Sequence, residues 1–398
     1  MKVYVVGTCD TKEQELVFAK SIIQAAGVPA VLVDVGTKAE AKAADFPAAQ
    51  VAAFHPDGPG AVLGKNDRGV AVAAMGLALA AFLKSRNDIG AVLGLGGTGN
   101  TTLVTGAMRE LPIGVPKLMV STVASGNTAP YVGPTDMAMM YSVVDIAGLN
   151  PISERVIANA ARAVAGMVKF AGPLARAAKP GIGMTMFGVT TPCVTEIRKL
   201  IGGDYECYVF HATGTGGQSM EKLADSGLVE GLIDATTTEV PDFLFGGVFP
   251  CTADRFGAVA RTRLPYVGSV GAVDMVNWGA RDTVPVRFAD RKLHVHNASV
   301  TLMRTTPEEN RQIGAWIASR LNKCDGPVRF VLPLGGVSMI DALGQPFHDP
   351  AADEALFAAI ESTLVQTPNR KLVKLPLHIN DPAFAAALVT NYRDIAKR

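Results

Sequence analysis

The sequence predicts an α/β fold of two lobes, each a mainly parallel sheet flanked by helices, with a cleft between them. Three observations predict it. The chain has 398 residues, more than one domain usually contains. Short β-rich runs alternate with longer helical patterns in the first third. The order of strand, hydroxyl-rich turn and helix then begins again near residue 181, so we expect two Rossmann-like lobes of related construction.

The first lobe is expected to alternate strands and helices. Its predicted strands are residues 2–7, 29–36, 89–96 and 116–122. The helix after the first strand has Asp10 or Thr11 as a plausible N-cap and ends at Gly27. The last helix of the lobe begins at Asn150 as cap, with Pro151 in its first turn.

A helix over residues 65–84 is predicted from an almost uniformly apolar run. The apolar run, residues 70–83, is 14 residues long, shorter than the roughly 20 residues that cross a bilayer. We therefore expect a helix buried in the lobe. The start of the chain shows no signal-peptide pattern, so we expect a cytoplasmic protein.

The boundary between the lobes is expected in an Ala- and Pro-rich stretch, residues 171–181, which gives domains 1–175 and 176–398. Residues 181–217 are typical of a strand, a turn, a helix, a strand and a glycine-rich turn. Later strand candidates are 231–236, 265–271, 328–334 and 371–377. A helix after Thr306 has a capping box with Glu309.

Composition excludes several functions. The formal net charge of +1 gives no basic surface for nucleic acid or for an anionic membrane. Five cysteines without C-x-x-C spacing predict reduced thiols rather than disulfides or a zinc site.

Four glycines at and just after the end of the strand 89–96 are the most informative motif. Gly94, Gly96 and Gly99 match G-x-G-x-x-G. A dinucleotide fingerprint follows the first strand and has an acid about 20 residues later, which is missing near Met119. No P-loop motif occurs either, so NAD and a common P-loop are both disfavoured.

The same turn can still bind an anion, because glycines let a ligand approach the amides at a helix N-terminus. The predicted cofactor-binding residues here are Gly96, Gly97, Thr98, Gly99, Asn100 and Thr101. No carboxylate precedes Glu110 to compete with an anion. A second hydroxyl-rich turn follows the next strand and adds Ser121, Thr122, Ser125 and Gly126. The alternative is that the glycines only allow tight packing.

The turn after the first strand is a further candidate. Asp10 is the predicted magnesium ligand, with Lys12 to neutralise phosphate and Thr8 to bind the cofactor. The alternative is that Asp10 only caps a helix and Lys12 is only solvated. Cys9 would be a nucleophile if its pKa were lowered, although no histidine base is identified. Asp34 either binds a ribose or holds a turn.

The second lobe repeats the pattern of strand, glycines and helix. Predicted substrate-binding residues are Gly214, Thr215, Gly216 and Gly217. A third glycine turn spans 335–338, and several such turns suggest a cleft between the lobes. His294 and His296 would share one face of a strand, but no third metal ligand is evident, so a structural role is favoured.

Long motifs in order give the sequence a family resemblance. They are GTCDTKEQE, GLGGTGNT, MRELPIGVPKLMVSTVASG, DMAMMYSVVDIAGLNPIS, VGAVDMVNWG and VTLMRTTPEEN. With them the chain resembles the Tm-one-like ATP-binding family, which contains bacterial proteins of unassigned activity and part of a plant virus-resistance protein. The resemblance implies two α/β domains, ATP and Mg²⁺ bound in the first, and a homodimer. It supplies no catalytic residues.

Two positions depart from the family pattern. Cys9 and Glu13 stand where leucine and glycine are usual, while Asp10 and Lys12 match. Gly335 stands where a basic residue is common, so substrate choice is expected to differ if that residue meets an anion.

These observations lead to a cytoplasmic ATP- and Mg²⁺-binding protein that acts as an enzyme on a small metabolite in the cleft. Catalytic residues are unknown, with Asp10 and Lys12 as candidates. One alternative is a non-catalytic module whose ATP stabilises a shape that grips a protein or metabolite. Another is a hydrolase or lyase that does not use ATP.

Overall fold

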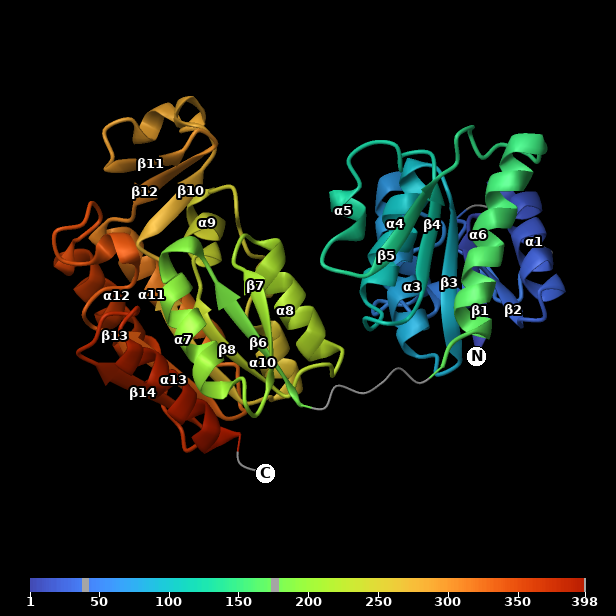
Figure 1. Cartoon of the computed structure of the whole chain (residues 1–398). Coiled ribbons are helices and arrows are strands. Elements are labelled where there is room, and N and C mark those ends of the chain that lie inside the picture. The colour runs from blue at the N-terminus through green and yellow to red at the C-terminus, as the bar shows by residue number, and fades with distance from the viewer. Residues whose placement is uncertain (38–42, 173–178, 397–398) are drawn as a thin grey trace. The chain divides into compact units, whose positions relative to one another are not determined.

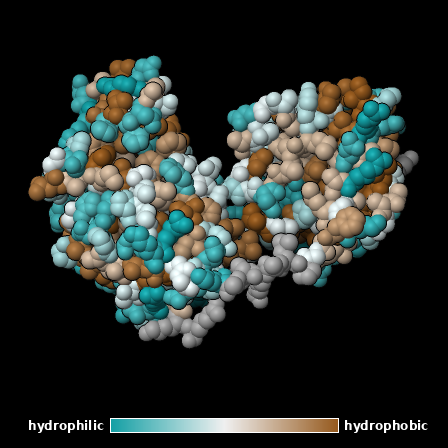
Figure 2. All heavy atoms as spheres, in the orientation of Figure 1, coloured by the Kyte–Doolittle hydropathy of each residue, from teal (hydrophilic) through white to brown (hydrophobic). Residues whose placement is uncertain are grey.

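The computed structural model describes residues 1–37, 43–172 and 179–396 (Figure 1). The chain divides into two compact units, Met1–Ala175 and Arg176–Arg398, whose boundary lies outside the described residues. Each unit is an α/β layer structure with its own parallel sheet, which confirms the predicted fold class. On the face shown in Figure 2, hydrophobic and hydrophilic residues are mixed over both units.

The sheet of the first unit is entirely parallel, with strand order β2-β1-β3-β4-β5. Its strands are β1 Lys2–Gly7, β2 Ala30–Asp34, β3 Ile89–Gly96, β4 Lys117–Ser121 and β5 Met137–Tyr141. The helices are α1 Cys9–Ala25, α2 Ala48–Ala52, η1 Pro59–Ala61, α3 Arg68–Lys84, α4 Thr98–Arg109, α5 Ala129–Val132 and α6 Pro151–Lys169. The four predicted strands are present.

Two hydrophobic cores lie on the two faces of this sheet. Alternate residues of β1 point to opposite faces, so Val5 packs with α1 and α6, while Tyr4 packs with α2, α3 and α4. The strand β5 was not predicted because its sequence, MAMMY, contains no β-branched residue.

The second unit has a six-stranded parallel sheet of order β14-β13-β9-β8-β6-β7. These strands are β6 Gly181–Met186, β7 Glu206–His211, β8 Gly231–Thr236, β9 Tyr266–Gly271, β13 Val328–Pro333 and β14 Arg370–Leu375. When strands are numbered within each parallel sheet, both sheets contain the order 2-1-3-4-5. The predicted likeness in construction between the lobes is therefore confirmed.

The second unit also carries an antiparallel sheet of β10 Met275–Trp278, β12 Val300–Arg304 and β11 Leu293–Asn297. Its α-helices are α7 Thr191–Ile201, α8 Thr215–Asp225, α9 Glu239–Phe245, α10 Gly257–Thr262, α11 Pro307–Leu321, α12 Pro350–Thr363 and α13 Pro382–Ile395. Its 3₁₀ turns are η2 Gly188–Thr190, η3 Arg281–Thr283, η4 Val286–Phe288 and η5 Met339–Asp341.

Helix caps show where local sequence determined the structure. Asn150 accepts hydrogen bonds from Ile152 N and Ser153 N, as the predicted cap of α6. The capping box of α11 at Thr306 is also confirmed. The predicted cap of α1 is wrong, because α1 begins at Cys9 and Asp10 lies in its first turn.

Burial corrects the expectation for α3, which begins at Arg68 and is capped by Asp67 rather than starting at residue 65. Met75 is fully buried, but Val70 is 54% exposed and Leu77 is 61% exposed. The helix is therefore buried on one side only. Within the described residues, no helix combines the length and the apolar character needed to cross a membrane.

Candidate functional site

The candidate site lies at the carboxyl edge of the first sheet. In a sheet of order 2-1-3-4-5 the direction of winding reverses between β1 and β3, and ligands of such sheets bind outside the strand ends at this point. The turns after β1 and β3 begin at Thr8 and Gly97. Gly96 at the end of β3 pairs with Ser121 at the end of β4. The structure thus brings the three predicted turns of the first lobe to one edge.

The N-cap of α4 is Gly97, which has no side chain to bind the first amides of the helix. Its first turn contains no acid, and Thr98 and Gly99 are exposed. In contrast, side-chain oxygens accept hydrogen bonds at the starts of four other helices. These caps are Asp67, Asn150, Thr306 and Asp349. The positive end of the α4 dipole is therefore open to an external anion.

Side chains beneath this turn hold it in place. Asn100 Nδ2 donates to Leu95 O at 2.5 Å. Thr101 Oγ1 lies 2.9 Å from Gly97 O and 2.6 Å from Ser121 Oγ, which in turn accepts from Val123 N. Thr101 and Ser121 are buried, so they position the turn rather than face solvent. Among the described residues, the buried Asn100 Oδ1 has no hydrogen-bond partner.

The glycines of the turn have two different roles. A Cβ atom on Gly94 would lie 2.5 Å from Met119 Sδ, and one on Gly96 would lie 2.7 Å from Asn100 Cβ. These two glycines are required by packing, as the alternative interpretation proposed. A Cβ on Gly97 would meet only Thr122 Oγ1, at 3.8 Å, and one on Gly99 would meet nothing within 4 Å. The space over Gly97 and Gly99 is therefore open.

The second hydroxyl-rich turn lies beside this space. Thr122 is half-buried, and its Oγ1 would lie 3.8 Å from a Cβ on Gly97, which places the hydroxyl beside the α4 N-terminus. Ser125 and Gly126 are exposed further along the same turn.

The turn after β1 presents Asp10 and Lys12. Asp10 is exposed and Lys12 is half-buried, and within the part of the chain that the structure describes neither makes an ion pair. A Cβ on Gly36 would lie 3.4 Å from Asp10 Cγ and 3.0 Å from Asp34 Oδ1, so the ends of β1 and β2 bring two carboxyl groups together. No cluster of three or more metal-ligating side chains occurs among the described residues. Asp10 alone would suffice for Mg²⁺ only if phosphates and waters supplied the other ligands.

Asp34 has a turn-holding role. Its Oδ1 accepts from Cys9 N at 2.9 Å and from Gly36 N at 2.8 Å, which fixes the start of α1. Burial raises the pKa of the Asp34 carboxyl above its ordinary value. Oδ2 is buried without a hydrogen-bond partner among the described residues.

Cys9 does not have the environment of a nucleophile. Its side chain is 5% exposed, and burial, followed by the neighbouring Asp34, raises the pKa of its thiol. Cys9 therefore lacks the lowered pKa that a thiolate nucleophile needs.

The glycine turn of the second lobe binds a carboxylate of the same unit. Glu239 Oε1 accepts from Gly214 N at 2.8 Å and from Gly217 N at 3.0 Å, and Glu239 is fully buried. A Cβ on Gly216 would overlap His211 O. These contacts explain the glycines at 214, 216 and 217, and a substrate role for them and Thr215 stays a prediction.

Glu239 belongs to a buried charged cluster that sequence reasoning missed. Arg255 donates to Glu239, Glu221 and Asp234, with N–O distances of 3.2, 2.8 and 2.8 Å. The partners come from separate strands, helices and loops, so no local spacing in the sequence indicates the cluster.

Two further predicted features have structural explanations. Gly335 N donates to Leu377 O, and a Cβ on Gly335 would lie 2.8 Å from His378 N. A residue with a side chain at position 335 would therefore require the backbone to move. His294 on β11 is half-buried against Phe347, whereas His296 is exposed. The described residues add no third ligand to this histidine pair.

Comparison with known proteins gives matches along almost the whole chain. The model of the "Uncharacterised protein family (UPF0261) N-terminal domain" matches residues 1–173, and that of the C-terminal domain matches residues 179–396. A UPF0261 protein of Rhizobium meliloti is 57% identical over 99% of both chains. One from Mesorhizobium japonicum is 58% identical over 100% of this chain and 99% of its own.

A plant protein and a solved structure also match. The ToMV resistance protein Tm-1(GCR237) of Solanum lycopersicum is 42% identical over 100% of this chain, which spans 56% of that protein. The Streptomyces glycosyltransferase SsfS6, complexed with thymidine diphosphate, matches at 11% identity over 67% of this chain and 81% of its own, with a TM-score of 0.17. So weak a structural likeness carries no argument.

Proposed function

The chain belongs to the uncharacterised protein family UPF0261, and from its geometry we propose that it is a cytoplasmic ATP-binding enzyme that acts on a small metabolite. The phosphates bind over Gly97 and Gly99 at the N-terminus of α4. Asp10 contributes a carboxylate to Mg²⁺, and Lys12 neutralises phosphate charge. Bound Mg²⁺ would supply charge neutralisation for phosphoryl or nucleotidyl transfer.

The α4 N-terminus carries this proposal. It is uncapped, has no acid in its first turn, and lies where strand winding reverses. Free amides at such a point attract phosphate, and the neighbouring Thr98 and Thr122 add neutral donors. The residues that hold the turn, Thr101 and Ser121, keep it preorganised for the ligand.

A non-catalytic binding module is the second candidate. It is favoured by the 42% identity to a tomato protein whose name records virus resistance. In that case ATP would stabilise a shape that grips a protein or metabolite. ATP consumption across a metabolite panel separates the two, because a binding module shows nucleotide affinity without turnover.

Calorimetric titration of MgATP into the wild type and two Gly97 variants tests the site. Gly97→Asp supplies an N-cap that occupies the helix amides and repels phosphate, while Gly97→Ala adds only a methyl group in open space. We expect Gly97→Asp to weaken binding at least about tenfold, or about 1.4 kcal/mol, with little change in Gly97→Ala. Unchanged affinity in folded Gly97→Asp, or no binding by the wild type, contradicts the proposal.

A further inference from the structure

The end of strand β5 presents two exposed hydrophobic side chains. Tyr141, the last residue of β5, is 42% exposed, and Val143 is 57% exposed. Because the strands of this sheet are parallel, both residues lie at the same carboxyl edge as the candidate site. Aromatic and aliphatic side chains form most of the surface of small-molecule sites, so these two are available to a ligand at this edge.

Strand register places the Tyr141 side chain on the face of the sheet that α4 covers. Tyr141 pairs with Ser121 of β4, and residues paired in a parallel sheet point to the same face. Ser121 Oγ lies 2.6 Å from Thr101 Oγ1 of α4. Alternation along β5 agrees, because Met137 and Met139 pack in the core on the α4 side. The Tyr141 ring and the α4 N-terminus therefore share one side of the carboxyl edge.

Tyr141 lies two strands away from the position proposed for the phosphates. Gly96, which ends β3 directly before the N-cap of α4, pairs with Ser121, and Ser121 pairs with Tyr141. At about 4.8 Å between neighbouring strands, the two steps add to roughly 10 Å. The α-phosphate and ribose of a nucleotide can span a gap of this size. Phosphates over Gly97 therefore leave the base within reach of Tyr141.

The chain between these two points carries no charge. Residues 121–135 contain no charged side chain. Asp136 follows them and forms an ion pair with Lys117, the first residue of β4, at the opposite edge of the sheet. In the other direction from the phosphates, Asp10 follows β1 and Asp34 ends β2. A neutral base and ribose fit the uncharged direction, and a metal ion fits the direction with carboxyl groups.

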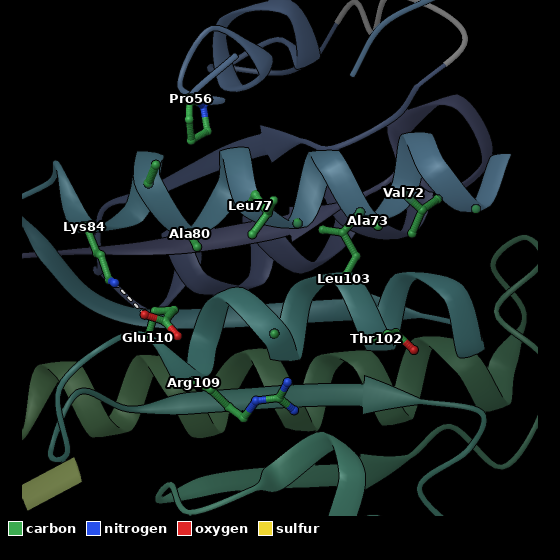
Figure 3. Close-up of a pocket in the computed structure, with 14 residues that line it drawn as sticks. Pro56, Val72, Ala73, Leu77, Ala80, Lys84, Thr102, Leu103, Arg109 and Glu110 are labelled. Carbon is green, nitrogen blue, oxygen red and sulfur yellow. Dashed lines mark hydrogen bonds and ion pairs between the residues drawn. The ribbon is translucent and has the colours of Figure 1, made fainter. Parts of the chain in front are cut away.

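Helix α4 itself holds the segment that leads into β5. Arg109, the last residue of α4, donates from Nη1 to Pro130 O at 2.7 Å and to Tyr131 O at 2.9 Å. Figure 3 shows Arg109 at the C-terminal end of α4 and Thr102 closer to its start. The helix whose N-terminus is open to phosphate thus also fixes α5, which lies between the hydroxyl-rich turn and β5.

The backbone after Tyr141 adopts a strained conformation that exposes Val143. Val143 has a φ of 68°, which is rare for a β-branched residue. Val144 N donates to Ser142 O at 2.8 Å, which closes a γ-turn of the rare, strained form with positive φ. Ser142 Oγ also donates to Val144 O, and Ser142 N donates to Ser121 O. Strain that the surrounding structure maintains is typical of ligand sites.

We propose that Tyr141 and Val143 form the surface on which the base of the bound nucleotide stacks. The inference rests on the proposed function, because it places the base relative to phosphates at the α4 N-terminus. A tyrosine ring offers a flat apolar face, and every nucleobase has a π-face that can stack on it. Stacking on these residues favours a nucleotide over an inorganic polyphosphate with the same phosphate chain.

Calorimetric titration of the full chain with MgATP and with magnesium tripolyphosphate tests the proposal, because only MgATP has a base. Tyr141→Ala is expected to weaken MgATP binding at least about tenfold and to leave tripolyphosphate binding unchanged. Tyr141→Phe keeps the ring and should retain the wild-type affinity for both ligands.

Phe170→Ala is the matched control, because Phe170 is an 82% exposed aromatic residue of the same unit. It follows α6, whose last turn lies near the start of β3, since a Cβ on Gly90 would lie 3.1 Å from Val168 Cγ1. Phe170 is therefore at the opposite edge of the sheet. Phe170→Ala should bind both ligands as the wild type does.

Val143→Gly is a second variant that keeps the backbone conformation, because glycine readily adopts a positive φ. It removes the side chain from the stacking surface in a protein that still folds. We expect weaker MgATP binding and unchanged tripolyphosphate binding.

The outcomes separate this inference from the proposed function. If the wild type binds MgATP and Tyr141→Ala binds it equally well, the base assignment is overturned and the phosphate site stands. If Tyr141→Ala loses affinity for tripolyphosphate as much as for MgATP, the stacking role is also overturned. A wild type that binds neither ligand overturns the proposed function and the base assignment together.

Discussion

Gly94, in β3, and Gly97, the N-cap of α4, lie three residues apart, yet their surroundings differ. A Cβ on Gly94 would lie 2.5 Å from Met119 Sδ and 2.8 Å from Val104 Cγ1. Gly97 faces open space beside Thr122. The motif in the sequence predicted a convergence of glycines and hydroxyls but could not separate packing glycines from those that face a ligand, because the packing partners belong to other elements.

Gly94→Ala should destabilise the protein without removing a ligand contact. The added methyl group overpacks the β3–α4 contact, so we expect a loss of about 1–3 kcal/mol in the free energy of unfolding. Chemical denaturation measures it, and MgATP affinity at a temperature where the variant is folded provides the control. If Gly94→Ala were as stable as the wild type, Met119 and Val104 would be able to move aside for the added methyl group.

A buried group of three carboxyls around Arg304 makes stability depend on pH. Asp341 and Asp353 accept from the guanidinium, and Asp274 is fully buried beside them. Burial, with the other carboxylates, raises the pKa of Asp341 to about 9, and burial raises that of Asp274 to about 6. A raised folded-state pKa gives stability that is complete below the unfolded pKa of about 3.9 and is lost as pH rises through the folded pKa.

The free energy of unfolding should therefore fall between pH 6 and pH 9, and Asp341→Asn should flatten the upper part of this decline. Denaturation at pH 6, 7.5 and 9 measures the slope for both proteins. If the stability of the wild type and of Asp341→Asn fell equally with pH, Asp341 would not be the titrating group.

Among helices, caps from neighbouring residues were predictable and caps from distant residues were not. Asn150 and Thr306 lie next to the helices that they cap. Glu239 caps α8 from 22 to 25 residues further along the chain, so the turn at 214–217 could not be distinguished from an open anion site by its sequence. The outward face of α3 was missed for a similar reason, since an apolar run does not show which residues remain uncovered.

Glu239→Ala should leave two buried amides and part of Arg255 without partners. Each unsatisfied buried group costs about 1–3 kcal/mol, so we expect the unfolding free energy to drop by about 2 kcal/mol or more. MgATP affinity should not change. Thermal unfolding measures the loss of stability, and calorimetry measures the MgATP affinity. Loss of ATP binding by a folded variant would instead place the nucleotide site in the second unit.

Over the whole molecule, the two units share a strand order but differ at the point where winding reverses. In the first unit β3 leads to α4, whose first turn contains no acid. In the second unit β8, its counterpart, leads to α9, whose first turn contains Glu239 and Asp242. These carboxylates oppose an anionic ligand, so common topology does not imply a common site.

A fragment of residues 1–172 should therefore fold and bind MgATP about as tightly as the full chain, while residues 179–398 should not bind it. Each unit has its own hydrophobic cores, which makes separate folding possible. Circular dichroism establishes folding and calorimetry measures binding. Binding by the second fragment alone would contradict the assignment.

The most direct test of the central claim is amide hydrogen exchange of the full chain with and without MgATP. We predict added protection at residues 96–102, which include the start of α4 without a side-chain cap, and at 121–126 beside it, and none at 213–219, where Glu239 already accepts from Gly214 N and Gly217 N. Protection at 213–219 with none at 96–102 would contradict the assignment of the nucleotide to the first unit.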